Sequence, residues 1–305
     1  MRLLGGYSRC RPLTKLYAMK KKYVLTDDSI TVDGRRLYRI KCVRPAGRAR
    51  RGNLGGYIEH EGNLSHYGNA WVDDSAMVMD DAVVEEDAQV CCYACVRGAA
   101  RISGHAMVFT SAVVDGSAIV SDYAWVQDWA EVSGNAIVRG HASISDDAQV
   151  KGSARVEDYA HVSGYARISG HVRLYGHAHI WGNARVSGSA KVFGNVSIYG
   201  SARINGKARV GGNAYIGGDA LVSQGDDYLH IDNLYPRFGK YNEYCSVTAF
   251  VTRNKAIEVV HTLLMPVTVE EFEAEIEKTY RGTDYMMQYQ AVVSLIKIWS
   301  EINRK

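Results

Sequence analysis

The sequence predicts a mainly β protein: a single-stranded left-handed parallel β-helix, shaped as a triangular prism of about nine coils, with an N-terminal β cap and a small C-terminal α+β domain. Three observations predict this fold. A six-residue period runs without a slip through residues 70–222. Glycine, asparagine and aspartate recur at fixed places within that period. The four prolines leave residues 46–235 free of proline, which suits a long ladder of hydrogen-bonded strands.

The period places a small residue and a branched residue at fixed positions. Every sixth residue from Ala70 through Ala220 is alanine, except Val172 and Val196, and the residue two positions later is β-branched or aliphatic. Because residues two apart on a strand share a face, both are expected to point inward. Three hexads make one coil, so each hexad stacks on the hexad 18 residues later, about 4.8 Å away.

Left-handed coiling requires corner residues that tolerate unusual backbone conformations. The expected corner residues are Gly134, Asn135, Asp146, Asp147, Gly182, Asn183, Gly188, Gly194 and Asn195.

A solenoid also needs caps, because its ends expose unpaired strand edges. We predict four segments: a disordered extension over residues 1–18, with Met19 as a plausible start of translation; an N-terminal cap and first coil over 19–69; the β-helix over 70–223; and an α+β domain over 224–305. Strand-like runs in the cap lie at 22–25, 36–43 and 52–59.

The predicted C-terminal domain combines a hairpin with two helices. Residues 246–252 and 256–261 are typical of a β-hairpin. Thr268 and Glu271 have the spacing of a capping box that opens a helix running to about Tyr280. A second helix is expected over 284–302, and its apolar face should carry Val292, Leu295, Ile296 and Trp299.

Composition indicates a soluble, cytoplasmic protein. The chain has no apolar stretch near the roughly 20 residues of a membrane helix, and its basic N-terminus lacks the apolar run of a signal peptide. The six cysteines have irregular spacing, so we expect reduced thiols. Cys91 should point outward between Asp73 and Phe109, whereas Cys95 should lie on the next face between Met77 and Val113. The cluster of Cys91, Cys92 and Cys95 therefore assembles no ligand shell, and we expect no metal site and no cofactor.

Charge is segregated along the chain and forms ladders. Residues 70–150 contain three Lys/Arg and 13 acids, whereas residues 151–222 contain nine Lys/Arg and three acids. One outward ladder is Arg155, Arg173, Lys191 and Arg209, and another is Arg167, Arg185 and Arg203. Neighbouring cations at this spacing repel by about 1 kcal/mol in water, and only Glu157 lies nearby to offset them. The ladders are either solvated surface or a site for nucleic acid, a nucleotide or an acidic protein.

Outward apolar residues in the first half predict an oligomer interface. They are Met77, Val83, Met107, Val113, Ile119, Trp125 and Ile137, together with Phe109. We expect a homo-oligomer, most simply a C3 trimer. The C-terminal helix is a second candidate interface.

Histidines supply the remaining candidates for chemistry. His161 and His179 are 18 residues apart, so they should stack on adjacent coils and could hold a metal or act as a base. Outward positions also tolerate any polar ring. His105, His141, His171 and His177 fall at corners. No residue is assigned as catalytic.

The repeat resembles the hexapeptide-repeat superfamily, whose best-known members are acyltransferases. Residues 37–40 (LYRI), 54–59 (LGGYIE) and 63–65 (NLS), the later Gly-Asn-Ala repeats, and residues 268–272 (TVEEF) resemble more narrowly the YdcK-like hexapeptide proteins common in phages and prophages. The resemblance covers nearly the whole chain from Met19. It implies the fold and says little about function.

Two functions stay open. One is a non-enzymatic phage- or prophage-type scaffold that binds a partner through its faces, in host interference or as part of a virion. The alternative is a coenzyme A-dependent acyltransferase, whose usual protruding loop is missing because the 26 hexads contain no insertion.

Overall fold

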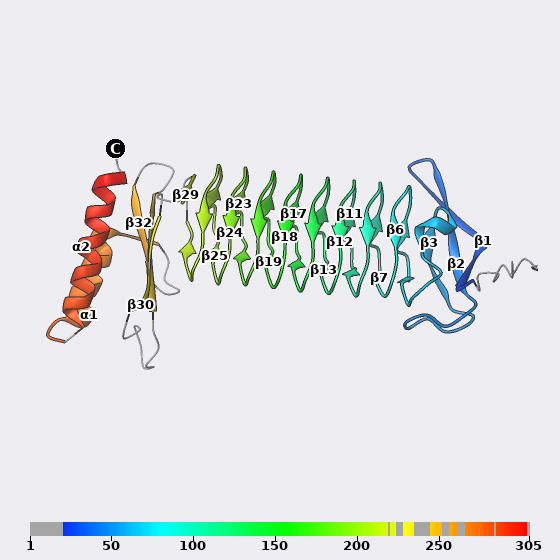
Figure 1. The fold of residues 1–305 in the computed structure, drawn as a ribbon, viewed down its shortest axis with the longest axis horizontal. Helices are drawn as coiled ribbons and strands as arrows, with labels where there is room; N and C mark the ends of the chain where they lie inside the picture. Colours follow the sequence, from blue (N-terminus) through cyan, green and yellow to red (C-terminus); the bar gives the residue numbers. More distant parts are fainter. Residues whose placement is uncertain are drawn as a thin grey trace, which may run out of the picture.

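The computed structural model describes residues 21–218, 220–223, 228–234, 245–251, 256–261, 266–283 and 285–303. The extension predicted for residues 1–18 therefore lies outside the described residues, as do residues 253–255 between the two runs of the predicted hairpin. The described chain forms a long rod with a cap at each end (Figure 1). The rod is a left-handed parallel β-helix of nearly nine coils, as predicted.

The rod consists of 26 two-residue strands that recur every six residues and stack as three parallel faces. Face 1 contains β5 (Met77–Val78), β8 (Cys95–Val96), β11 (Val113–Val114), β14 (Glu131–Val132), β17 (Gln149–Val150), β20 (Arg167–Ile168), β23 (Arg185–Val186), β26 (Arg203–Ile204) and β29 (Leu221–Val222). Face 2 contains β6 (Val83–Val84), β9 (Arg101–Ile102), β12 (Ile119–Val120), β15 (Ile137–Val138), β18 (Arg155–Val156), β21 (Arg173–Leu174), β24 (Lys191–Val192) and β27 (Arg209–Val210). Face 3 contains β4 (Trp71–Val72), β7 (Gln89–Val90), β10 (Met107–Val108), β13 (Trp125–Val126), β16 (Ser143–Ile144), β19 (His161–Val162), β22 (His179–Ile180), β25 (Ser197–Ile198) and β28 (Tyr215–Ile216).

The interior matches the predicted pattern. The alanine and aliphatic positions of every hexad are at most 1% exposed, from Ala70 to Val222. Each fully buried valine or isoleucine contributes about 1.5–3 kcal/mol of transfer free energy. From β5 to β29 the first residue of each strand is at least partly exposed, so each face of the rod displays one such side chain per coil.

The corners differ from the prediction in one respect. Gly134, Asp146, Gly182, Gly188 and Gly194 have left-handed backbone, with φ between 56° and 81°. The second corner residues Asn135, Asp147, Asn183 and Asn195 are not among the residues with positive φ, so the prediction was wrong for these four. One left-handed residue per corner is enough to turn the chain.

The N-terminal cap is a hairpin joined to face 1. β1 (Tyr23–Val32) and β2 (Arg35–Cys42) are antiparallel, and β3 (Leu54–Ile58) pairs with both β2 and β5. A 3-10 helix, η1 (Glu61–Asn63), follows. β1 is longer than the predicted run at 22–25, because Asp33 and Gly34 both take positive φ and close a tight hairpin.

The C-terminal cap is a four-stranded antiparallel sheet with two helices behind it (Figure 1). Its strands are β30 (Tyr228–Leu234), β31 (Cys245–Val251), β32 (Ile257–His261) and β33 (Val267–Thr268), and its helices are α1 (Val269–Tyr280) and α2 (Met286–Asn303). Phe250 and Val260 belong to the rod's core cluster, whereas Ala249 and Val259 pack with the helices. The sheet therefore seals the open end of the rod.

The predicted helices are present. The capping box is confirmed: the amide of Glu271 donates to Thr268 Oγ1 at 3.1 Å, and the amide of Thr268 donates to Glu271 Oε2 at 2.9 Å. On α2, Val292 and Ile296 are buried, but Leu295 is 45% exposed, so its placement on the buried face was wrong. α2 packs on one side only, and this buries a narrower stripe than expected. Within the described residues, no helix combines the length and apolarity that crossing a bilayer requires.

Candidate anion-binding surface

The face 1 ladder consists of Arg167, Arg185 and Arg203. Direct register pairing places Arg185 between the other two, and all three side chains are exposed. None of them forms an ion pair with another residue of the part of the chain that the structure describes. Their charges therefore repel one another at adjacent-strand spacing, and no carboxylate of the described residues pairs with them.

The residues that follow this ladder on each coil are polar donors. Two positions after each arginine come Ser169, Ser187 and Asn205, and the preceding coil offers Lys151, which pairs with Glu131 at 2.9 Å. Hydroxyl, amide and guanidinium groups are the donors that proteins present to phosphate oxygens. This strip of face 1 is thus suited to an anion.

The face 2 ladder consists of Arg155, Arg173, Lys191 and Arg209, again in direct register. Glu157, whose side chain is only 6% exposed, accepts from Arg173 at 3.2 Å and pairs with Arg139 at 2.7 Å. The prediction that Glu157 offsets part of this ladder is confirmed. One carboxylate shared by two arginines leaves a net positive strip.

Two arginines of the face 2 ladder make cation–π contacts with aromatic rings. The guanidinium of Arg173 lies 5.7 Å from the ring centre of Tyr175, and that of Arg209 lies 5.9 Å from the ring centre of Phe193. The two rings stack at 5.4 Å with 12° between their planes. Gly211 has no Cβ to block the Phe193 ring that covers it. Guanidinium groups that lie against rings in this way are pre-oriented and lose less freedom on binding.

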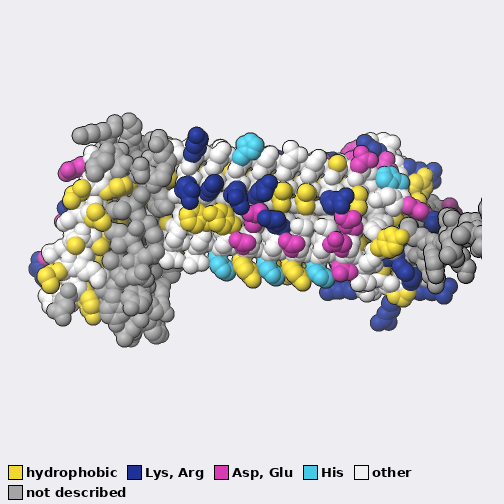
Figure 2. Space-filling model, viewed as in Figure 1, with side chains coloured by type: hydrophobic (Ala, Val, Ile, Leu, Met, Phe, Trp, Pro, Cys, Tyr) yellow, Lys and Arg dark blue, Asp and Glu magenta, His cyan; other side chains and the backbone are white. Residues whose placement is uncertain are grey.

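The two ladders meet at one edge of the prism. His171 and Lys207 lie at exposed corners between face 1 and face 2 strands. Figure 2 shows the resulting row of Lys and Arg side chains on the half of the rod nearer the C-terminal cap, with apolar rings beside it. The structure thus brings the two predicted ladders together on adjacent faces, and it leaves face 3 without arginine or lysine at its outward strand positions.

The acidic half of the rod has a structural explanation. Carboxylates at the left-handed corner positions accept hydrogen bonds from the backbone amide one coil later. Asp122 accepts from Gly140 at 3.0 Å, Asp146 from Gly164 at 2.8 Å and Asp158 from Gly176 at 3.0 Å. An aspartate therefore supplies both the corner conformation and a bond to the next coil.

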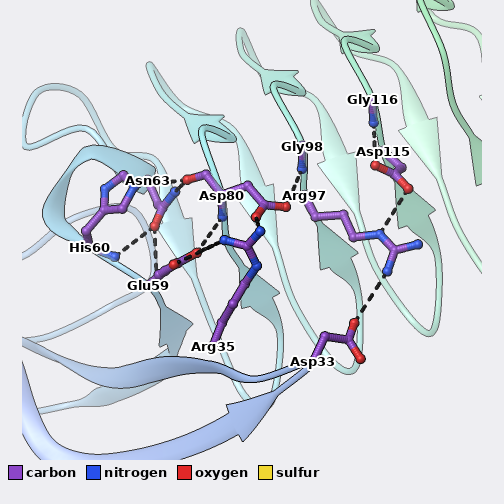
Figure 3. A network of polar contacts seen from close by, with 10 residues as sticks. All are labelled: Asp33, Arg35, Glu59, His60, Asn63, Asp80, Arg97, Gly98, Asp115 and Gly116. Atoms are coloured by element: carbon purple, nitrogen blue, oxygen red, sulfur yellow. Dashed lines mark hydrogen bonds and ion pairs between the residues drawn. The ribbon is translucent and has the colours of Figure 1, made fainter.

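Acids near the N-terminus also attach the cap to the rod (Figure 3). Asp80 pairs with Arg35 of the hairpin at 2.6 Å and accepts from the Gly98 amide at 3.0 Å. Arg97 bridges Asp33 at 3.8 Å and Asp115 at 3.0 Å. These side chains join the cap to the rod and do not point together into an open cavity, so we assign them a structural role.

The structure brings the predicted histidine pair together. His161 and His179 are register partners on β19 and β22, with ring centres 4.7 Å apart. Burial lowers the pKa of both rings, and a nearby Asp146 carboxylate opposes this shift at His161.

The corner histidines form a column that our sequence reasoning missed. We call it the edge column, because it lies at the edge between faces 2 and 3. Its neighbouring ring centres are 4.9–5.0 Å apart, and their planes are within 17° of parallel. The column consists of His105, Tyr123, His141, Tyr159 and His177. The file lies along the lower edge of the rod in Figure 2. A tyrosine or histidine at every eighteenth residue was the available signal. His171 lies apart, at the edge between faces 1 and 2.

The predicted interface residues do not share one face. Met77 and Val113 are on face 1; Val83, Ile119 and Ile137 are on face 2; Met107 and Trp125 are on face 3. Among them only Trp125, at 48%, counts among the exposed large apolar residues. Phe109 packs edge-on against Trp125 at 6.1 Å. A single partner face therefore covers only part of this set.

The clustered cysteines lie near the start of the rod. Cys91, Cys92 and Cys95 are free thiols, and burial raises the pKa of Cys91 to about 12 and that of Cys95 as well. Cys95 lies between Met77 and Val113 on face 1, as predicted. Within the described residues, no group of three or more His, Cys, Asp or Glu side chains could hold a metal ion.

Comparison with known proteins supports the repeat. A family model described as YdcK Beta solenoid repeat matches residues 100–116, which fall within the stacked coils. The chain matches no curated protein. These comparisons are consistent with a β-solenoid repeat protein and add no partner or activity.

Proposed function

We propose that this protein is a rigid binding scaffold whose two cationic ladders bind a linear polyanion, and that the polyanion is nucleic acid. The observation that carries the proposal is the uncompensated face 1 ladder of Arg167, Arg185 and Arg203. Six of the seven ladder residues are arginine, which pairs with phosphate through two parallel N–H bonds. Ladders along a straight rod match a polymer with regularly repeated charge.

Nucleic acid fits this surface better than an acidic protein does. Arg173 and Arg209 are already oriented by the Tyr175 and Phe193 rings, and arginine–aromatic pairs of this kind also contact unstacked bases. The same rings would add nothing to the affinity for an acidic peptide, which has no bases to stack on them. Binding to polyglutamate at least as tight as binding to an oligonucleotide of equal charge would contradict the choice of nucleic acid.

The test is fluorescence anisotropy with a labelled single-stranded oligo(dT) and the intact protein. Replacing Arg167, Arg185 and Arg203 by serine should weaken binding roughly tenfold or more at moderate salt, because three phosphate contacts are lost. The matched control replaces Arg97, Arg101 and Arg139, which already pair with carboxylates at 3.0, 2.6 and 2.7 Å. Equal weakening by both triple variants would show that only net charge matters.

We also propose a phage or prophage setting, on the basis of the family resemblance. Interference with a host nucleic-acid system and a place in the virion are both compatible with a polyanion-binding rod. Genomic neighbourhood distinguishes them, because counter-defence genes and tail genes cluster separately. For the acyltransferase alternative, calorimetry with coenzyme A is the direct test, and the unbroken series of strands from β4 to β29 lends it no support.

We also propose that the protein is a homo-oligomer, with a trimer as the simplest form. The exposed Trp125 of face 3, backed by Met107 and Phe109, is the strongest contact point. Light scattering should give a mass that is a multiple of the 33.7 kDa chain at micromolar concentration. A monomer under these conditions would remove the proposal, and Trp125→Ser should shift an oligomer towards monomer.

A further inference from the structure

Face 3 carries a histidine pair whose geometry differs from that of the parallel rings between faces 2 and 3. His161 and His179 lie opposite each other on neighbouring parallel strands, with ring planes tilted by 55°. The rings of the edge column, such as His141 and Tyr159, are parallel within a few degrees. Parallel rings cannot point two nitrogens at one atom, whereas tilted rings can.

The pair also has an unsatisfied nitrogen. Nε2 of His179 is buried and has no hydrogen-bond partner in the described part of the chain. Leaving a buried polar atom without a partner costs about 1–3 kcal/mol. Small side chains flank the pair along the face, with Ser143 before His161 and Ser197 after His179. The site therefore has room beside the rings.

The ring separation fits two ligands of one metal ion. A metal lies about 2.0–2.1 Å from an imidazole nitrogen, so two ligating rings have centres roughly 4.5 Å apart at a right angle and roughly 5.2 Å apart at a tetrahedral angle. The observed separation of 4.7 Å lies within this interval. Trp181 packs against the His179 ring at 4.3 Å and itself stacks on Tyr199 at 5.0 Å, which fixes the ring orientation.

We propose that His161 and His179 form a two-histidine binding site for a borderline transition-metal dication such as Zn²⁺, Cu²⁺ or Ni²⁺, with water in the remaining positions. Imidazole is a preferred ligand for these ions, whereas Mg²⁺ and Ca²⁺ select oxygen ligands. No third side chain of the described residues completes the shell. The site is therefore open, and its ion can accept a further ligand from solution.

The electrostatic surroundings are compatible with a cation at neutral pH. Burial favours the neutral ring of each histidine, the form with a free lone pair. The Asp146 carboxylate is close enough to act on His161, and no lysine or arginine occupies the outward strand positions of face 3. Binding should weaken as pH falls to about 5, because protons then compete for the rings.

The experiment is calorimetric titration of Zn²⁺ into full-length protein without a polyhistidine tag at pH 7.5, with Cu²⁺ electron paramagnetic resonance as a second readout. We expect calorimetry to give one bound ion per chain and the Cu²⁺ spectrum to show hyperfine coupling to two nitrogens. His161→Ser and His179→Ser, which copy the serines of the same column, should each weaken binding at least tenfold. The matched control is His105→Ser with His177→Ser, which removes two histidines from the edge column and should leave binding unchanged.

Two outcomes would overturn the site: no saturable binding up to about 1 mM Zn²⁺, or undiminished binding in both His161→Ser and His179→Ser. Unchanged thermal unfolding of the apo variants separates loss of ligands from loss of fold. Oligo(dT) anisotropy should be unaffected by these variants, so failure of the metal site and failure of the anion-binding proposal are distinguishable.

Discussion

Single corner residues determine how tightly the coils stack. At each corner one residue takes a left-handed conformation, and it is usually glycine, or aspartate when its carboxylate can accept the next coil's amide. At Gly140 the φ angle is 74°, and a Cβ would lie 2.9 Å from the backbone nitrogen of Asp158. Both the conformation and the close approach disfavour larger residues.

We therefore predict that Gly140→Val lowers the free energy of unfolding by more than about 2 kcal/mol, since a β-branched residue suffers both strain and contact. Gly140→Asp should cost clearly less, because Asp122 takes the same conformation one coil earlier with φ at 60°. Urea unfolding followed by circular dichroism measures both. An equal loss of unfolding free energy in the two variants would show that the left-handed backbone conformation does not determine which residues the corner tolerates.

A buried lysine in the N-terminal cap gives a pH dependence. Lys22 is 0% exposed, and its Nζ donates to the Ala70 carbonyl at 2.7 Å. Burial, with Arg44 nearby, lowers its pKa to about 8. Between this value and the unfolded pKa of about 10.4, the unfolded chain holds a proton that the folded chain has released. The Lys22 contribution to stability therefore rises with pH in that window, whereas the thiols of Cys42, Cys91 and Cys95, whose pKa burial raises, contribute a fall over the same range.

The difference in free energy of unfolding between the wild type and Lys22→Met should therefore rise by roughly 2 kcal/mol between pH 7.5 and 9.5, because the thiol contributions cancel in that difference. Measurements stop at pH 9.5 because burial raises the pKa of Tyr23, so ionisation of the unfolded tyrosine reverses the trend at higher pH. Urea titrations at four pH values suffice. An identical pH profile in Lys22→Met would assign the effect to another group.

At the scale of elements, the edge column acts as a stabilising file of rings. Tyr123 stacks on His105 at 4.9 Å and on His141 at 5.0 Å. Aromatic pairs contribute about 0.5–1.5 kcal/mol each. Tyr123→Ser should therefore lower the free energy of unfolding by roughly 1–2 kcal/mol. Tyr165→Ser is the control, because Tyr165 is 61% exposed and has no ring contact within the described residues; similar losses would refute the stacking contribution.

The elements of the rod were predictable and those of its caps were only partly so. A strict period determines which side chain of each hexad points inward, so Ala70 through Val222 could be assigned from spacing alone. The ladders on faces 1 and 2 followed from the same register. The sealing of the rod by Phe250 and Val260 could not be predicted, because contacts between a solenoid end and a separate sheet have no period. The edge column was visible at 18-residue spacing, but only when tyrosines are read together with histidines.

At the scale of the whole molecule, the fold separates stability from recognition. The core runs along the axis and the caps close both ends, so outward positions are free to vary without cost to packing (Figure 1). In the half nearer the C-terminal cap, those positions carry seven ladder cations on two adjacent faces. A straight, stiff rod holds these charges in line, which favours a partner whose charges are also in line.

The most direct test of this account is the salt dependence of oligo(dT) binding. Each neutralised phosphate of a single strand contributes about 0.7 to the slope of log K against log salt concentration. Removing Arg167, Arg185 and Arg203 together should reduce the slope by about 2, with weaker binding at every salt concentration. An unchanged slope in that variant would contradict the claim that the face 1 ladder contacts the polyanion.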